Sequence, residues 1–162
     1  MAKIDIKELT GWLGQYEIIV QDLSGDIIER TGLRPNLITD AGLNMFRDLL
    51  SGAITDGEIK YVGLGNDATA PANGQTDLVA EQYRKQVTSQ ANGGSAGVLT
   101  TTVYIPPDEA NTFTTEEIGW FAGSAASATT DSGIMVARVL YSRVKNNLES
   151  WTIRRVDTVG RA

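Results

Sequence analysis

Glu116 and Glu117 are the acidic pair in this sequence whose residue types could support catalysis. Glycoside hydrolysis needs two carboxylates about 5 to 9 Å apart on either side of one bond. Both residues lie in a run typical of a β-strand, where adjacent side chains point to opposite faces. We therefore expect one solvated carboxylate, one that is buried or paired with an arginine such as Arg138, and no catalytic residues.

Loop aspartates are the only candidates for a metal site, because their oxygens are ligands that calcium prefers. Their spacing is not that of an EF-hand loop, and we interpret them as solvated or capping residues. Residues 63–67 contain two glycines but lack the third glycine and the lysine of a phosphate-binding loop, so they indicate a turn. No metal and no cofactor is expected. The aspartates are Asp67, Asp77, Asp108 and Asp131.

Cysteine and histidine are both absent from the 162 residues. Their absence excludes disulfides, thiolate metal sites, cysteine nucleophiles and serine–histidine–acid triads. Fourteen basic and twenty acidic residues give a net charge of -6, which repels nucleic acids and anionic membranes. With neither a signal-like start nor an apolar run of roughly 20 residues, we expect a non-enzymatic protein made and kept in the cytoplasm.

The large aromatic residues near the expected strands serve either a core or a recognition face. Trp120 and Phe121 are neighbours, so one of them points away from the side on which the other is buried. That outward residue either lies at an interface or is covered by a second layer such as a helix. A core position is the default for Tyr141 and Trp151. The interface candidates are Trp12, Tyr83, Trp120, Phe121, Arg154 and Arg155.

A hairpin and one helix are the elements with the strongest local signals. Extended runs at 16–20 and 27–30 are separated by a polar turn that contains Gly25. Thr39 is placed to cap a helix over about 40–51, and Gly52 is placed to end it. We expect the helix to bury a face made of Leu43, Phe46, Leu49 and Leu50.

Short runs separated by turn residues follow the helix and indicate an antiparallel β-meander. Residues 78–84 form either one helical turn or an extended lead-in. The fold class is mainly β (α+β), an antiparallel β-sandwich with one principal helix, in a single domain over residues 1–162. The expected strands cover residues 59–65, 85–90, 98–105, 118–121, 134–141 and 150–156.

Four further segments could mediate assembly. Residues 1–13 form either a docking arm or, with more support, a strand that completes the sheet. Loops 91–97 and 123–133 have no large apolar anchors, so we expect them to be mobile until neighbouring subunits order them. Arg154, Arg155 and Arg161 could meet an acidic neighbouring subunit, but pairing with the chain's own carboxylates is slightly favoured.

Five stretches, taken in order, resemble the bacteriophage tail-collar fibre family and related small phage virion proteins. Together they cover residues 37–138, more than half of the chain, and their order and spacing carry the resemblance. The fourth stretch is similar to an aromatic-Thr-x-x-Glu-x-Gly-aromatic pattern of that family. The stretches are residues 37–43, 59–66, 78–84, 105–121 and 133–138.

The resemblance implies a homotrimeric domain that attaches a fibre to the phage tail. No repetitive shaft or receptor-binding tip follows Val156, which departs from that family's pattern. We therefore expect a virion structural protein of the tail fibre, collar or baseplate, whose partners are copies of itself and neighbouring tail, baseplate or capsid proteins. The alternatives are a capsid decoration protein and a glycan-binding adhesin that uses Trp120, Tyr141 or loop aspartates.

Overall fold

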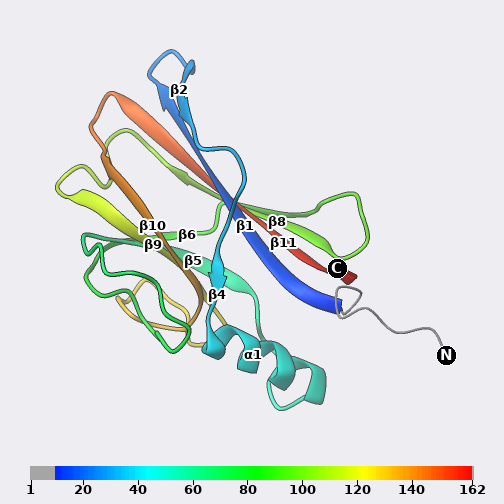
Figure 1. Cartoon of the computed structure of the whole chain (residues 1–162). Helices are drawn as coiled ribbons and strands as arrows, with labels where there is room; N and C mark the ends of the chain where they lie inside the picture. The colour runs from blue at the N-terminus through cyan, green and yellow to red at the C-terminus, as the bar shows by residue number, and fades with distance from the viewer. Residues whose placement is uncertain (1–9, 162) are drawn as a thin grey trace.

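The computed structural model describes residues 10–161 and shows two antiparallel sheets packed face to face with one helix at an end (Figure 1). This architecture confirms the expected β-sandwich. The first sheet has the order β2-β1-β11-β8-β7, with β3 also paired to β1, and the second has the order β4-β10-β9-β5-β6.

The first sheet consists of β1 (Thr10–Asp22), β2 (Ile27–Arg30), β3 (Arg34–Pro35), β7 (Ser89–Asn92), β8 (Val98–Ile105) and β11 (Glu149–Arg161). The second consists of β4 (Leu37–Ile38), β5 (Ile59–Gly65), β6 (Glu81–Gln86), β9 (Thr114–Ala122) and β10 (Ile134–Val144). The helix is α1 (Asp40–Ser51). Residues 78–84 thus lead into a strand and form no helical turn.

The chain crosses between the two sheets at both edges of the sandwich. On one side, Pro35 in β3 pairs with β1, and Leu37 in β4 already pairs with β10. On the other side, the Val87 amide donates to Lys60 of the second sheet, and the next amide, that of Thr88, donates to Thr102 of the first. Strands that change sheets in this way form the corners of a sandwich.

The expected meander is correct for the strands at 98–105, 118–121, 134–141 and 150–156, but the expected strand at 85–90 spans the change of sheet between β6 and β7. The expected order of neighbours is also wrong. β8 pairs with β11, whereas β9 and β10 between them in sequence belong to the other sheet. Within the first sheet, β1 and β11 pair over thirteen residues, from Thr10 opposite Arg161 to Asp22 opposite Glu149. Residues 10–13, placed in a possible docking arm, are therefore strand, and the rest of that arm lies outside the described residues.

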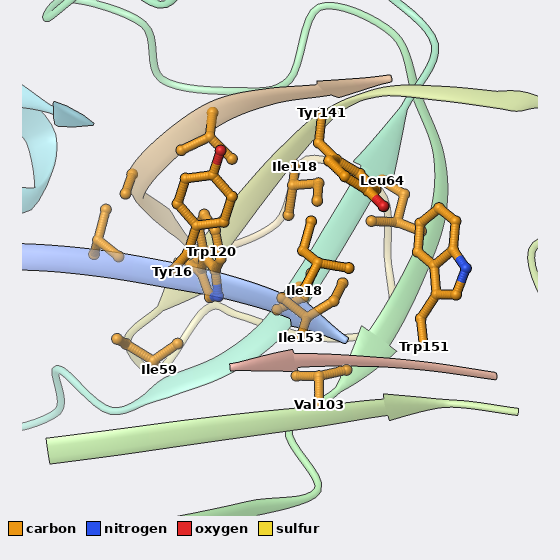
Figure 2. Packing of buried hydrophobic residues seen from close by; sticks show 14 of the residues in the cluster. Tyr16, Ile18, Ile59, Leu64, Val103, Ile118, Trp120, Tyr141, Trp151 and Ile153 are labelled. Carbon is orange, nitrogen blue, oxygen red and sulfur yellow. The ribbon is translucent and has the colours of Figure 1, made fainter. Parts of the chain in front are cut away.

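The core lies between the sheets, where alternate residues of both inner faces meet (Figure 2). Ile18 and Ile153 of the first sheet and Leu64 and Ile118 of the second are fully buried. Trp120 and Trp151 are the largest side chains of this layer. Apolar burial at roughly 25 cal/mol per Å² is the main stabilising contribution to such a core.

Helix α1 begins and ends where its sequence signals place it. The Thr39 hydroxyl accepts a hydrogen bond from the Gly42 amide, and Gly52 ends the helix with a left-handed φ of 76°. Gly42 allows close packing, because a Cβ there would lie 2.9 Å from the carbonyl oxygen of Val136 in β10.

The buried face of α1 agrees only in part with the expected one, because Phe46 and Leu49 are half-buried. Gly42 and Met45 are buried, whereas Leu43 and Leu50 are 50% and 77% exposed. The helix covers only one end of the sandwich. Its buried face is therefore narrow and centred on Gly42, which packs against Val136 of β10. Within residues 10–161, no helix is long and apolar enough to cross a membrane.

Candidate functional site

Glu116 and Glu117 are adjacent on β9 and point to opposite faces, as expected. Glu117 is fully buried, accepts a 2.6 Å hydrogen bond from Nε of Arg138, and also accepts from the Val79 and Ala80 amides. Glu116 accepts from the Ser142 hydroxyl. The expected pairing with Arg138 is confirmed, and the two carboxylates do not face a common substrate.

Arg138 also fixes the long connection between β5 and β6. Its Nη1 donates to the Thr69 carbonyl at 2.7 Å and to the Gln75 side chain at 3.4 Å. Gly65 leaves room for this arrangement, because a Cβ there would lie 2.3 Å from Oε1 of Glu117. One member of the acidic pair, Glu117, thus forms a structural ion pair with Arg138, which holds a loop to the sheet.

Trp120 and Phe121 are both fully buried, so neither is a surface interface residue of the chain. Trp120 lies in the main core, and Phe121 lies on the opposite face of β9, in a second cluster with Leu78, Ala126 and Met135. The guanidinium of Arg84 stacks on the Phe121 ring at 3.9 Å. The covering layer is made by loop segments and an arginine instead of the helix.

Arg154 and Arg155 pair with carboxylates of their own chain, as the favoured interpretation held. Arg154 lies 2.6 Å from Glu17 on the outer face of the first sheet. Arg155 is fully buried and donates two 2.7 Å hydrogen bonds to Asp157, which also accepts from Nε1 of Trp12. Arg155 is therefore a core residue, and its place among the interface candidates was wrong.

Tyr83 and Tyr141 have internal partners too. The hydroxyl of half-buried Tyr83 donates to Glu109, and burial together with this carboxylate raises the pKa of Tyr83. Tyr141 is buried and donates to Glu29. Trp120 and Tyr141 therefore cannot contact a glycan at the surface, as the glycan-binding alternative requires.

The four loop aspartates do not converge. Among residues 10–161, no group of three acidic side chains is placed to hold a metal ion. Asp131 lies near Glu81, and burial together with the charges of Glu81 and Asp77 raises the pKa of Asp131. Its backbone amide, not its carboxylate, donates to Glu81.

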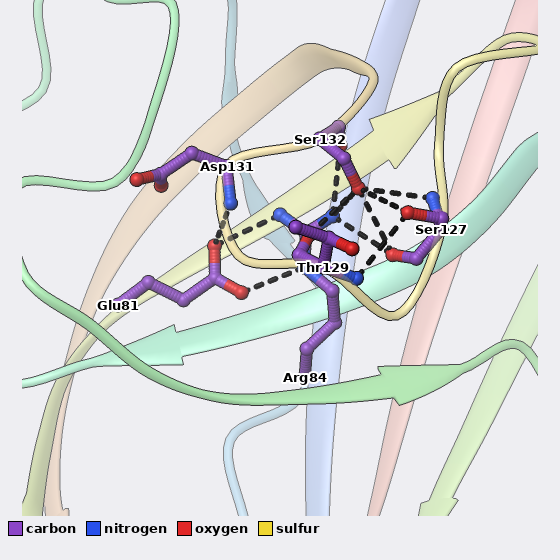
Figure 3. A network of polar contacts seen from close by, with 6 residues as sticks. All are labelled: Glu81, Arg84, Ser127, Thr129, Asp131 and Ser132. Atoms are coloured by element: carbon purple, nitrogen blue, oxygen red, sulfur yellow. Dashed lines mark hydrogen bonds and ion pairs between the residues drawn. The ribbon is translucent and has the colours of Figure 1, made fainter.

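Loop 123–133 is held by Arg84, a residue whose role the sequence analysis missed (Figure 3). Nη1 of Arg84 donates to the carbonyl oxygens of Ser127 and Ser132 and to the Ser132 hydroxyl. Arg84 is itself paired with Glu81 at 2.6 Å. We expected this loop to be mobile because it has no large apolar side chains to anchor it. The polar contacts with Arg84 anchor it instead.

Two hairpins project from the sandwich on the side away from α1 (Figure 1), and their tips carry exposed apolar side chains. We call this region the hairpin end, formed by the tips of the β1–β2 and β10–β11 hairpins. Each of its five apolar residues has more than half of its surface exposed. Because contiguous exposed apolar patches can mark protein contact sites, the hairpin end is a candidate contact surface. The residues are Leu23, Ile27, Ile28, Val144 and Leu148.

Arg143 holds the two hairpins of the hairpin end together. It forms ion pairs with Glu29 of the first hairpin and, at 2.8 Å, with Glu149 of the second. Glu149 also accepts a 2.9 Å hydrogen bond from Nε1 of the buried Trp151. Arg143 therefore ties the two hairpins to each other within the chain.

The stability of this arrangement should depend on acid pH through Glu149. Burial opposes ionisation of Glu149, but hydrogen bonds from Arg143 and Trp151 outweigh it and lower the pKa of Glu149. A carboxyl whose pKa is lowered in the folded state stabilises the fold above its unfolded pKa, and this contribution is lost as pH falls through the folded pKa. We expect urea unfolding between about pH 7 and about pH 3 to show a smaller pH dependence in Glu149→Gln than in the wild type. Glu58→Gln, which removes an exposed carboxylate, should keep the wild-type dependence; equal slopes for all three proteins would contradict the assignment.

A second apolar feature lies at the other end of the sandwich, between α1 and the ends of β1, β8 and β11. We call it the terminal groove, and its volume is about 210 Å³. The rings of Trp12 and Phe46 lie 5.8 Å apart in its wall, and Glu58 and Asp157 are its acidic residues. Its apolar lining is Trp12, Met45, Phe46, Leu49, Ile59, Leu99 and Val159.

The comparisons with protein-family models, curated proteins and solved structures found no match to this chain.

Proposed function

We propose that this chain is a non-enzymatic structural protein of a tailed bacteriophage particle. It acts in the tail fibre, collar or baseplate, through contacts with copies of itself and with neighbouring virion proteins. The hairpin end carries this proposal, because its five exposed apolar side chains lie on two hairpin tips that the Arg143 ion pairs join. The assignment to a phage particle rests on the resemblance of residues 37–138 to tail-collar fibre proteins.

The arrangement of charges supports an assembly role over a catalytic one. Glu117, Arg138, Arg155 and Asp157 are buried in ion pairs within the chain. Glu81 and Arg84, whose side chains are almost fully covered, form another such pair. Catalytic acids and bases need access to a substrate, and these groups are instead bonded to their own scaffold.

A head decoration protein is the second candidate, because cementing a capsid uses the same kind of apolar contact between copies. The two roles differ in copy number. Decoration proteins follow the capsid lattice and its many equivalent positions, whereas a tail attachment component occupies the few positions set by the symmetry of the tail.

Quantitative mass spectrometry of purified particles, with the major capsid protein as reference, tests the proposal. We expect the chain to be present at a small fraction of the capsid protein. An abundance comparable to that of the capsid protein would replace the tail role with head decoration. Complete absence from purified particles would overturn the structural proposal.

A further inference from the structure

The terminal groove has the size and shape to take side chains of an extended segment. Its volume of about 210 Å³ lies below the roughly 300–1,000 Å³ of most small-molecule sites. It adjoins a wider hollow of about 490 Å³ along the β7–β8 loop, and the two share Gly97 and Leu99 in their linings. An elongated apolar depression of this kind fits a chain segment better than a compact cofactor.

The first nine residues of this chain have the matching chemistry. Ile4 and Ile6 alternate with Lys3, Asp5 and Lys7, so an extended conformation places both isoleucines on one face. Lys3, Asp5 and Lys7 lie on the opposite face of such an extended segment, so its apolar face is the one that would contact the groove.

The position of Thr10 favours the groove of another subunit over the chain's own. Thr10 pairs with Arg161 at the end of β1, two residues beyond Trp12, which lines the groove. The strand therefore runs past the groove and away from it. Nine extended residues span about 30 Å, enough to reach a neighbour directly, whereas a return to the same subunit would require a reversal immediately before Thr10.

We propose that residues 1–9 of one copy dock in the terminal groove of a second copy, with Ile4 and Ile6 as the side chains that fill it. The inference rests on the proposed function, since it names one of the contacts between copies. Each copy both donates a segment and accepts one. Such a head-to-tail contact closes into a ring when the rotation between copies permits, as in a trimer.

Cysteine cross-linking tests this contact directly, because the natural chain contains no cysteine. Full-length Ile6→Cys is mixed with full-length Val159→Cys, whose cysteine lies in the groove, and the mixture is oxidised. Leu148→Cys replaces Val159→Cys in the matched control, because Leu148 is also exposed but lies at the hairpin end. Mass spectrometry identifies the disulfide-linked peptides in each mixture.

We expect the Ile6–Val159 mixed disulfide to exceed the Ile6–Leu148 control by about tenfold or more, since docking raises the effective thiol concentration. A double variant that forms only an intramolecular disulfide, with no mixed product, would place the segment in its own groove and overturn the exchange between copies. Mixed products equal to the control would show that the groove does not take this segment. Either failure leaves the presence of the chain in particles untouched, whereas absence from particles would refute the proposed function itself.

Discussion

Replacing Arg138 with leucine is expected to lower the free energy of unfolding by about 3–5 kcal/mol, the usual cost of removing one partner of a buried ion pair. Both side chains of the Glu117–Arg138 pair are fully buried. The substitution would leave the Glu117 charge with only the Val79 and Ala80 amides as hydrogen-bond donors. It would also release the β5–β6 connection, which Arg138 holds through Thr69.

Urea unfolding followed by tryptophan fluorescence measures this loss. Arg47→Leu is the matched control, because it makes the same substitution in an ion pair whose arginine is 67% exposed and whose carboxylate partner, Asp48, is 33% exposed. Exposed pairs contribute about 0–1 kcal/mol, so the control should remain close to the wild type. Equal losses in the two variants would show that burial does not set the importance of the Arg138 pair.

The local elements of this fold could be predicted from the sequence because their signals lie within a few residues. Thr39 and Gly52 mark the two ends of α1, and both act there as caps. The turn containing Gly25, with a φ of 89°, joins the expected hairpin strands. The Glu117–Arg138 pair could also be predicted. Side chains alternate along a strand, so one of two adjacent glutamates must point inward.

The long-range arrangement could not be predicted in the same way. Strand alternation shows that Phe121 and Trp120 lie on opposite faces, but it does not show that Leu78 and Arg84 cover Phe121. Sequence periodicity likewise gives α1 an apolar stripe without showing that only a narrow part of it meets β10. These outcomes depend on which strands become neighbours, and β8 and β11 are separated in sequence by two strands of the other sheet.

The polar anchors of the candidate site were missed for a related reason. Arg84 and Arg143 lie in strands whose sequences look like ordinary half-exposed segments. Some of their partners are distant in the chain: Ser127 and Ser132 for Arg84, and Glu29 for Arg143. Glu81, three residues before Arg84, is the only local signal for the first. Arg143 has Glu149 six residues away, but Glu29, its other partner, is separated from it by 114 positions.

We expect lysine substitutions at the apolar tips of the hairpin end to prevent the chain from assembling into particles. Ile28→Lys with Leu148→Lys puts two lysines on exposed positions of the two hairpins, and edge lysines oppose association because their charge must be desolvated. Both side chains are more than half exposed, so the fold should be retained. We expect the amount of this variant in particles to fall by at least about tenfold, which corresponds to about 1.4 kcal/mol of lost contact energy.

The content of this variant in purified particles tests the account most directly. A phage that lacks the gene is supplied with the wild type, the hairpin-end variant or the control Leu43→Lys with Leu50→Lys, which places two lysines on the exposed face of α1. Thermal unfolding first confirms that all three proteins are folded. We expect wild-type content for the control and at least about a tenfold loss for the hairpin-end variant. Equal incorporation of all three proteins, or the absence of the wild type from particles, would contradict the proposed role of the hairpin end in virion assembly.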